Sequence, residues 1–520
     1  MGARSLIARM FGRDLPAPAP DRVEPVIVRN APLRPAGRRN GFAAAQWDRL
    51  TYDWGVTPQA LDIFLRQGLR GLRARSRSLA INNDYMRQFL RRVRTNVIGA
   101  EGFSLQVAAE DSPGKPDEKA NDKIKAEWDA FGKLGACTVC GRFSWTELQQ
   151  LVITSLARDG EVLLREIRGY KNKWGYALQV LSVDQLDETL TRGTTDGQNE
   201  VRMGVEIDQF NRPVAYHLWR NNPADQASLG AQQRQEVIRV PASDIIHLYM
   251  VEDAGQTRGF PWGCSSMRRL QMLGGYEEAA LVAARTGAAK MGFFTNRSEE
   301  TVGPPQGERD PSDGAFIQDA EPGSFEVLPE GWDFKEWNPA YPTGEMLPFV
   351  KGMLRGAASG LGVSYNSLTS DLESVNYSSI RAGTVEDRDE WRAIQAYLRD
   401  HLGVRVFGTW LEQSLLANAL GGLPLAKFDK FNRPVFQPRG WDWVDPKNDI
   451  EADALKIKLG LSSRTRIAAA RGVDFDQIMR EQAAEQKIAQ KHGITLADPT
   501  APQQPTGQAG AATQGANAND

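Results

Sequence analysis

Apolar residues recur at helical spacing between Trp145 and Leu156. Leu148, Leu151 and Val152 share this pattern, and polar residues fill the positions between them. The spacing places the apolar side chains on one face of an amphipathic helix. We expect this helix to end before the pair Asp159-Gly160.

Four short segments after this helix have the pattern of β-strands. They are residues 161–167, 174–181, 201–207 and 214–219. A polar turn separates the first two, and Asn211-Arg212-Pro213 separates the last two, so each pair is predicted to form a hairpin. Helices combined with hairpins predict an α+β domain.

A long helix is predicted after Pro261. Its pattern of three- and four-residue steps runs through Leu270, Leu273, Glu277, Leu281, Ala284, Ala288 and Met291. Residues 267–292 would span about 39 Å at about 1.5 Å per residue. Its many alanines would let a second helix approach closely, so we expect this helix to need packing partners.

The rest of the chain predicts a compact insertion followed by helices. Residues 296–343 are polar and rich in Pro and Gly, with strands expected at Phe325–Leu328 and Trp332–Trp337. Further helices are predicted at 346–357, 379–402, 450–459 and 463–490.

Length and composition describe a globular protein of several parts. The 520 residues exceed one ordinary core, and 41% of them are hydrophobic. Three cysteines are too few for a disulfide framework, which favours a reducing compartment. The most apolar stretch, 279–294, is interrupted by Arg285 and Lys290, so we expect no membrane span. The N-terminal residues do not have the pattern of a secretory signal, and we expect the protein to stay in the cytoplasm.

Charge is unevenly distributed along the chain. Residues 1–100 contain 18 Arg, no Lys and 7 acidic residues, a net charge of +11, which leaves −13 for the remainder. This distribution indicates contact with nucleic acid or with an acidic protein surface, and a solvated arm explains it equally well. Segments 15–40 and 498–520 have compositions typical of flexible chain.

Two motifs suggest metal binding but have simpler interpretations. Cys137 and Cys140 form a C-x-x-C, but no second ligand pair stands at the required spacing, which favours two small buried residues. An acidic cluster, which would hold Mg²⁺ in a nuclease, consists of Glu386, Asp387, Asp389 and Glu390. It alternates with Arg381, Arg388 and Arg392 on a predicted helix, which favours ion pairs on a solvated or subunit-facing surface.

Two glycine motifs do not match catalytic patterns. Gly360-Leu361-Gly362 lacks the ending of a phosphate-binding loop and fits a helix C-cap. Gly263-Cys264-Ser265-Ser266 does not match the nucleophile pattern G-x-S-x-G. We therefore predict no enzyme activity, no metal and no cofactor.

A basic stretch near the N-terminus is expected to lie on solvated helix faces. Its arginines are Arg70, Arg73, Arg75, Arg77, Arg87, Arg91, Arg92 and Arg94. There are two alternative interpretations: this stretch contacts DNA, or it contacts scaffold or capsid protein.

Five segments together match the pattern of one family. They are GLGVSYNSLTSDLESVNYSSIRAGTVEDRDEWRAIQAYL (360–398), NNDYMRQFLRRVRTNVIGAEGFSLQ (82–106), GVEIDQFNRPVAYHLW (204–219), RVPASDIIHLYMVEDAGQTRGFPWG (239–263) and WDWVDPKNDIEADALKIKLGLSSRTRIAAARG (441–472). Through these segments the chain resembles the lambda family of phage portal proteins, from about residue 40 to about residue 485.

The resemblance implies a portal fold and a ring oligomer of about twelve subunits around a channel. The implied parts are a flexible basic arm (1–40), an α+β wing (41–264), two stem helices (265–295 and 344–362), a small α/β clip between them (296–343), a tunnel loop (363–378), a long helix returning to the wing (379–445), a helical crown (446–492) and a disordered tail (493–520).

The resemblance also implies which residues face other molecules. The tunnel loop would present Asn366, Ser367, Thr369, Ser370, Asp371, Glu373 and Asn376 to DNA. It contains no Lys or Arg, so it would not grip phosphate, and a weakly acidic lining would let DNA slide. The clip would dock a terminase through Arg297, Glu299, Glu300, Glu308 and Asp310.

The function implied is that of a channel at one capsid vertex of a virion assembled in the host cytoplasm. Double-stranded DNA would pass through it during packaging and ejection. The implied partners are the terminase large subunit, the major capsid and scaffold proteins and a head-completion protein, with no membrane. A monomeric DNA-binding module and a metal-dependent nuclease are the rival hypotheses.

Overall fold

The computed structural model describes most of the chain between residues 57 and 493. The described residues are 49, 55, 57–195, 197–224, 236–289, 292–296, 308–309, 316–317, 332–336, 344–373, 376–441 and 446–493. For 286–289, 377–380 and the four short segments between 292 and 336, only the backbone is described. Residues 1–59 form a unit of their own, and everything below concerns residues 60–520.

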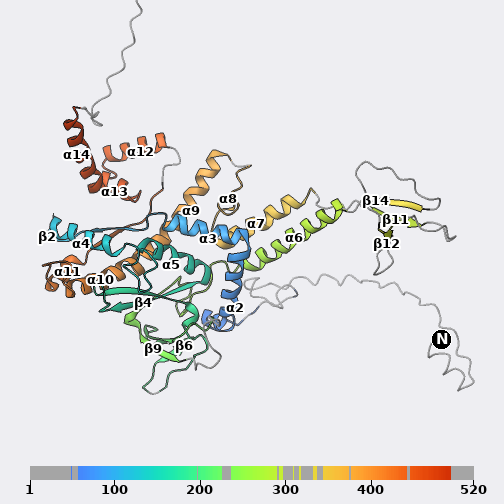
Figure 1. The fold of residues 1–520 in the computed structure, drawn as a ribbon, viewed down its shortest axis with the longest axis horizontal. Helices are drawn as coiled ribbons and strands as arrows, with labels where there is room; N and C mark the ends of the chain where they lie inside the picture. The colour runs from blue at the N-terminus through green and yellow to red at the C-terminus, as the bar shows by residue number, and fades with distance from the viewer. Residues whose placement is uncertain are drawn as a thin grey trace, which may run out of the picture. The chain divides into compact units, whose positions relative to one another are not determined.

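The first four described helices are coloured blue to teal in Figure 1. They are α2 (Leu61–Asn82), α3 (Asp84–Val97), α4 (Glu118–Phe131) and α5 (Trp145–Asp159). The start of α5 is fixed by a capping box, in which Ser144 and Glu147 bind each other's backbone N–H. Its end is fixed by Gly160, which has a φ of 88° and lies against the backbone of Phe260, where no side chain would fit.

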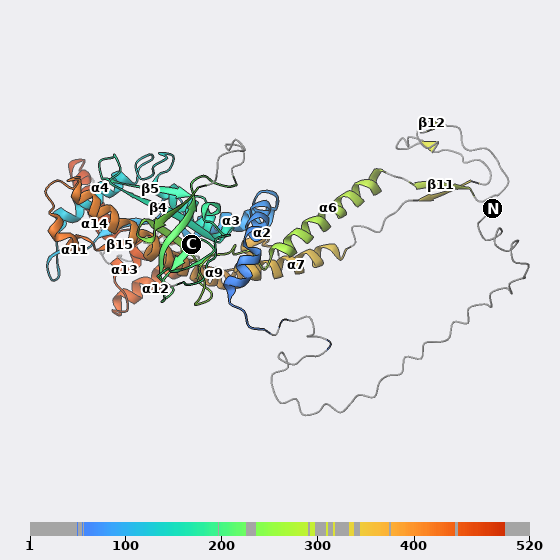
Figure 2. The same ribbon diagram turned by 90° about the horizontal axis from the view of Figure 1, so that it is seen from below.

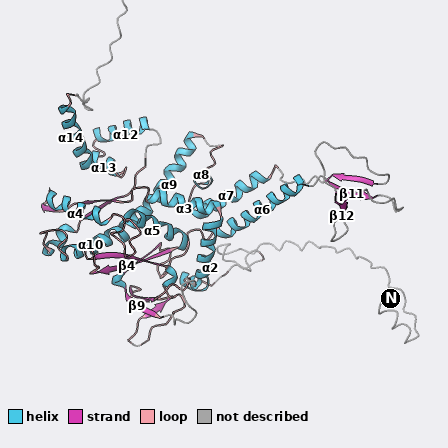
Figure 3. Cartoon of the chain, viewed as in Figure 1, coloured by secondary structure: helices cyan, strands magenta, loops and turns pink. Residues whose placement is uncertain are grey.

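Two antiparallel sheets lie below α5 in the view of Figure 3. The first has the order β10-β4-β5 and consists of β4 (Glu161–Arg168), β5 (Tyr176–Leu181) and β10 (Ile245–Tyr249). The second has the order β6-β7-β8-β9 and consists of β6 (Glu200–Arg202), β7 (Val205–Ile207), β8 (Pro213–Trp219) and β9 (Val237–Pro241). Short 3-10 turns, Val183–Gln185 and Ala242–Asp244, follow β5 and β9.

The main core is built from helices and strands far apart in sequence. Its centre is Trp128, whose ring contacts Trp410 edge-on at 5.1 Å and Phe407 at 5.6 Å. Strand β1 (Ser104–Val107) pairs antiparallel with β15 (Pro434–Gln437), which brings Phe436 to the same cluster. A second, smaller core joins the two sheets around Leu163, Val205 and Tyr216.

The long helices α6 (Met267–Ala289) and α7 (Met346–Leu361) run antiparallel, side by side (Figure 2). Ser266 donates to the Ala357 carbonyl at 2.9 Å at one end of the pair, and the Tyr276 ring contacts the Phe349 ring at a tilt of 59° further along. The strands between them in sequence are β11 (Gly292–Asn296), β12 (Glu308–Arg309), β13 (Phe316–Ile317) and β14 (Trp332–Glu336), paired β11 with β14 and β12 with β13.

The C-terminal half is helical. The short α8 (Tyr365–Thr369) precedes α9 (Tyr377–Leu398), which continues through a π-helical turn (Arg399–Gly403) into α10 (Val404–Leu416). The remaining elements are a 3-10 turn (Leu425–Lys427), α11 (Phe428–Phe431), α12 (Pro446–Lys458), α13 (Arg464–Ala469) and α14 (Phe475–Lys491), and a small hairpin of β2 (Glu110–Ser112) and β3 (Lys115–Pro116) precedes α4.

Most of the elements expected from the sequence are confirmed. They include α5, the β4–β5 hairpin, the strand at 332–336, and α6, α7, α9 and α12. Gly362 caps α7 in the left-handed conformation, as the sequence predicted. The predicted strand Phe325–Leu328 and the predicted flexible segments 15–40 and 498–520 lie outside the described residues.

Three predictions about elements are wrong. Residues 201–207 form two strands, because Met203 and Gly204 both adopt positive φ and reverse the chain. The helix predicted over 463–490 is two helices, because Gly472 breaks it with a φ of 75°. The long helix ends at Ala289, and residue 292 already belongs to β11.

Candidate functional site

The segment predicted to face DNA contains a short helix. Helix α8 begins at Ser364, whose hydroxyl accepts a hydrogen bond from the Ser367 N–H, and ends at Ser370 in the left-handed conformation. Leu368 points into the main core and is only 1% exposed. The first half of the expected loop is therefore a folded element, which corrects its description as a loop throughout.

Asp387 of α9 holds the start of α8. Its carboxylate accepts hydrogen bonds from the Ser364 N–H at 3.0 Å, from the Ser364 hydroxyl at 2.8 Å and from the Ser367 hydroxyl. These bonds satisfy backbone and side-chain donors at the N-terminus of α8, where a negative charge is also favourable.

Helix α3 holds the other end of α8. The Arg92 guanidinium donates to the Ser367 carbonyl at 3.2 Å and to the Ser370 hydroxyl at 3.1 Å. Gln88, one turn earlier on α3, donates to the same hydroxyl at 3.4 Å. The exposed carbonyl that ends a short helix is thereby bound by a cation, as the helix dipole favours.

Lys351 of α7 pairs with both carboxylates of the segment. Its ammonium lies 3.2 Å from Asp371 and 3.5 Å from Glu373. Hydrogen bonds from the Glu373 N–H, the Tyr365 hydroxyl and Lys351 hold the pKa of Asp371 below its usual value. The cluster of two carboxylates and one ammonium carries a net charge of −1.

The most exposed part of this site follows Asp371. Leu372 is 60% exposed, and the side chain of Glu373 is 78% exposed. Asn376, directly before α9, is also exposed. The predicted residues Asn366, Ser367, Thr369, Ser370, Asp371 and Glu373 thus lie together on and just after α8.

The residues predicted to dock a terminase lie mostly outside the described part of the chain. This holds for Arg297, Glu299, Glu300 and Asp310, while the backbone of Glu308 belongs to β12. The sequence did not indicate that Arg92 and Lys351 would contact the predicted loop. No signal in the sequence links them to it, because they are far from it along the chain.

The acidic cluster on α9 is divided among different partners. Asp387 binds the α8 serines, and Asp389 pairs with Arg392. Arg388 and Arg392 lie over the ring of Trp441. The described residues bring no three acidic, His or Cys side chains together at metal-binding distance. Of the C-x-x-C pair, Cys137 is buried as expected, whereas Cys140 is exposed, which corrects the prediction of two buried residues.

The predicted solvated face of the basic stretch is wrong at Arg73. Arg73 is 2% exposed, and its guanidinium donates to the fully buried Glu161 at 3.2 Å. Glu161 also accepts from Arg258, from His247 and from the Gly259 N–H. Arg73 therefore belongs to a buried charge network that joins α2 to the β10-β4-β5 sheet.

Comparison with known families gives the context for this arrangement. The family described as "Phage portal protein, lambda family" matches residues 48–395, which include both sheets, the α6–α7 pair, α8 and most of α9. The chain belongs to the lambda family of phage portal proteins. The match contains the candidate site from Ser364 to Asp387.

Relatives in the portal family are similar over most of their length. The chain is 35% identical over 486 residues to a "Probable portal protein" of Halomonas phage phiHAP-1, covering 92% of this chain and 90% of the relative. It is 21% identical to "Portal protein B" of Escherichia phage lambda, covering 83% of this chain and 86% of that protein. Both alignments extend beyond the family match toward the C-terminus of this portal-family chain.

Solved structures similar to this portal-family chain come from gene transfer agent (GTA) particles. One is titled "Neck of empty GTA particle computed with C6 symmetry", with 14% identity, a TM-score of 0.44 and coverage of 78% of this chain and 94% of that chain. Another, from the neck of a native particle, has 14% identity, a TM-score of 0.41 and coverage of 76% and 93%. Among the described helices, none is both long enough and apolar enough to cross a membrane.

Proposed function

We propose that this chain forms a closed ring of about twelve subunits at one vertex of a viral capsid and that double-stranded DNA passes through the ring. In this proposal residues 265–295 and 344–362 are the stem, 296–343 the clip, 363–378 the DNA-facing segment and 446–492 the crown. The ring serves packaging and later ejection, and energy comes from a separate terminase.

The observation that carries the proposal is the apolar surface of the α6–α7 pair. Met272, Leu281 and Val282 of α6 are 65%, 62% and 53% exposed, and Leu347 and Phe349 of α7 are 59% and 47% exposed. Apolar side chains at this density on a helix pair are typical of a protein interface. Neighbouring copies in a ring would cover them.

A groove between α6 and α7 adds to this surface. Its volume is about 470 Å³, and its lining includes Met272, Leu273, Tyr276, Phe349 and Met353. Methionine and aromatic side chains are enriched at the centres of protein interfaces. In a ring, a side chain from the adjacent subunit would fill this groove.

The site around α8 supports the channel. Its two carboxylates are paired with Lys351, and the guanidinium of Arg92 is bound to serine oxygens. Few cations are therefore left there to bind phosphate. A surface of small polar groups with a charge near zero would hold DNA weakly, which favours translocation over binding.

The partners follow from the same proposal. A terminase large subunit would dock on the clip near Arg297, Glu299, Glu300, Glu308 and Asp310. A head-completion protein would later take its place, and the wing would contact the major capsid and scaffold proteins. Assembly would take place in the host cytoplasm and end in the virion.

Negative-stain electron microscopy of the purified full chain tests the ring. We expect end-on views with about twelve subunits around an open centre. Met272→Glu with Leu281→Glu should abolish the rings, because each change places a charge in an apolar interface. Phe210→Ser is the control, since Phe210 is 79% exposed at the β7–β8 turn, away from α6.

The outcome is decisive in both directions. Rings in wild type and in Phe210→Ser, with monomers in the double variant, support the proposal. Monomers in wild type under all conditions would overturn it and favour a monomeric DNA-binding module.

A further inference from the structure

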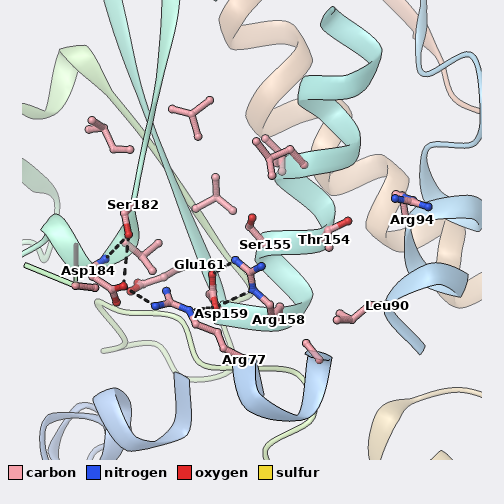
Figure 4. A pocket seen from close by; sticks show the side chains of 18 of the residues that line it. Arg77, Leu90, Arg94, Thr154, Ser155, Arg158, Asp159, Glu161, Ser182 and Asp184 are labelled. Atoms are coloured by element: carbon pink, nitrogen blue, oxygen red, sulfur yellow. Dashed lines mark hydrogen bonds and ion pairs between the residues drawn. The ribbon is translucent and has the colours of Figure 1, made fainter. Parts of the chain in front are cut away.

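A cleft lies between α2, α3, α5 and β5, and α3 borders both this cleft and the site on α8. Its volume is about 770 Å³ (Figure 4). Most of its lining lies between Arg77 and Asp184 in the sequence, and Asn222 and Ala224 complete it. The cleft differs from the α6–α7 groove because five arginines line it. Its charges fall into two groups.

The first group is neutralised within the protein. Arg77 donates to Asp159 at 2.8 Å and to Asp184 at 2.5 Å, and Arg158 donates to Asp159 at 2.7 Å. Figure 4 shows these side chains gathered at one end of the cleft and joined by dashed lines. This end is a structural ion-pair cluster and has no charge left for a ligand.

The second group consists of Arg87, Arg91 and Arg94 on α3. The three are exposed and stand at positions i, i+4 and i+7, on one face of the helix. Within the described residues the guanidinium group of none of them makes a hydrogen bond or an ion pair, and Figure 4 shows Arg94 apart from the Arg77 cluster. A row of three positive charges about 10 Å long therefore borders the cleft.

The surface beside this row is apolar. Leu151 of α5 and Val180 and Leu181 of β5 are each only partly buried, and all three line the cleft. Ile81, at the end of α2, also lines it and is 71% exposed. A single exposed apolar residue is common on protein surfaces, but here it lines one cleft together with partly buried apolar residues and unpaired guanidinium groups. This combination matches a partner with an apolar side and an acidic side.

We propose that this cleft docks an acidic, amphipathic helix of another protein. Apolar residues of that helix would cover Ile81, Leu151 and the β5 residues. Carboxylates spaced by three or four residues would meet Arg87, Arg91 and Arg94, since the arginine row covers two helical turns. This docking role is separate from the ring and the channel and does not depend on them.

Other occupants fit less well. Duplex DNA presents phosphate and would leave the apolar surface uncovered. The chain's own residues 1–48 contain eight Arg and four acidic residues, so their charge has the wrong sign. Residues 494–520 contain only two acidic residues and no helical apolar pattern.

Fluorescence anisotropy on the full chain provides the test. The probe is a labelled synthetic helix of about 18 residues, with Leu on one face and Glu on the other, long enough to be helical. One control peptide has Lys in place of Glu, and a second has the same composition in scrambled order. A labelled duplex DNA is the third probe.

Three variants locate the binding site. Reversing Arg87, Arg91 and Arg94 together to Glu should weaken binding of the Leu/Glu peptide by about tenfold or more, since each exposed pair contributes modestly. Ile81→Ser should weaken it by about threefold, because part of an apolar contact is lost. Arg75→Glu is the matched control, since Arg75 is exposed on α2 but does not line the cleft.

The proposal stands if the Leu/Glu peptide binds saturably, both cleft variants lose affinity, and Arg75→Glu binds like wild type. It fails if the peptide does not bind, or if the scrambled peptide binds equally well, which would indicate a charge effect alone. It also fails if DNA binds more tightly through the same three arginines. Circular dichroism of each variant separates lost binding from lost folding.

Discussion

Glu161 shows how a single side chain organises a buried charge network at the β10-β4-β5 sheet. It is fully buried at the first position of β4 and accepts hydrogen bonds from Arg258, His247, Arg73 and the Gly259 N–H at 2.5–3.2 Å. Burial alone would raise its pKa, but the charge of Arg258 and the hydrogen bonds from His247 and Arg258 hold the pKa well below its usual value. Glu161 therefore stays ionised and compensates two buried arginines.

Glu161→Gln should strongly destabilise the fold. The change keeps the size of the side chain but removes the carboxylate that pairs with the buried Arg258, while Arg73 keeps its ion pair with Glu188. Breaking a buried pair such as Arg258–Glu161 costs about 3–5 kcal/mol. Urea unfolding followed by circular dichroism measures the loss. Glu200→Gln is the control, because Glu200 pairs with Arg202 nearer the surface, where a pair contributes about 1 kcal/mol or less. Equal midpoints for the two variants would contradict this role of Glu161.

Among the elements, α8 depends most on contacts from outside itself. Five residues are too few to form a stable helix alone. The missing stability comes from hydrogen bonds to Asp387 of α9 and Arg92 of α3 and from the burial of Leu368. The segment is consequently fixed up to Asp371, while Leu372 and Glu373 after it are exposed.

Asp387→Ala should loosen α8 without unfolding the protein. The variant loses three hydrogen bonds at the helix start, and losing a cap costs about 1 kcal/mol or somewhat more. Hydrogen exchange of the amides of residues 364–370 should accelerate by roughly tenfold, which corresponds to about 1.4 kcal/mol. Asp389→Ala, two residues away, removes only an exposed pair with Arg392 and should leave this exchange unchanged.

Elements with strong local signals could be predicted from the sequence. The apolar face of α5 and the following Gly160 both indicate one helix, so its type and its start at Trp145 are confirmed, and the helix includes Asp159, one residue beyond the predicted end. The β6–β7 hairpin was missed because its turn uses Met203, a residue that seldom adopts positive φ. The helix α8 was missed because it is held by Asp387 and Arg92, and such long-range contacts leave no periodic pattern.

At the scale of the whole molecule, two strands from distant parts of the chain pair with each other. Strands β1 and β15 pair from Ser104↔Gln437 to Val107↔Pro434, and Phe436 packs against Trp128. The helices after β15, which are α12, α13 and α14, contribute almost no side chains to a core. Among their described residues only Ala489 is buried. The C-terminal boundary of the main core therefore lies near Gln437. No sequence pattern predicts this pairing, since both strands are short and more than 300 residues separate them.

Two truncations should have opposite effects. A chain that ends at residue 443 loses surface ion pairs such as Arg480–Asp122 and should keep nearly the same thermal midpoint. A chain that ends at residue 432 loses β15 and Phe436 and should not fold into a soluble protein, because it exposes the aromatic core around Trp128. Solubility and thermal melting of both chains measure the difference. A stable 432-residue chain would show that β15 is dispensable.

The π turn at Arg399–Gly403 has a consequence for how such chains diverge. A π turn accommodates one extra residue within an otherwise α-helical rod. Removing one residue between the π turn and Phe407 would rotate the preceding part of the rod by about 100° relative to Phe407 and Trp410, which lie in the core. Removing one residue within the turn would convert it into regular α-helix and leave both faces in place. A single-residue deletion within Arg399–Gly403 should therefore be tolerated better than one in the adjoining regular helix.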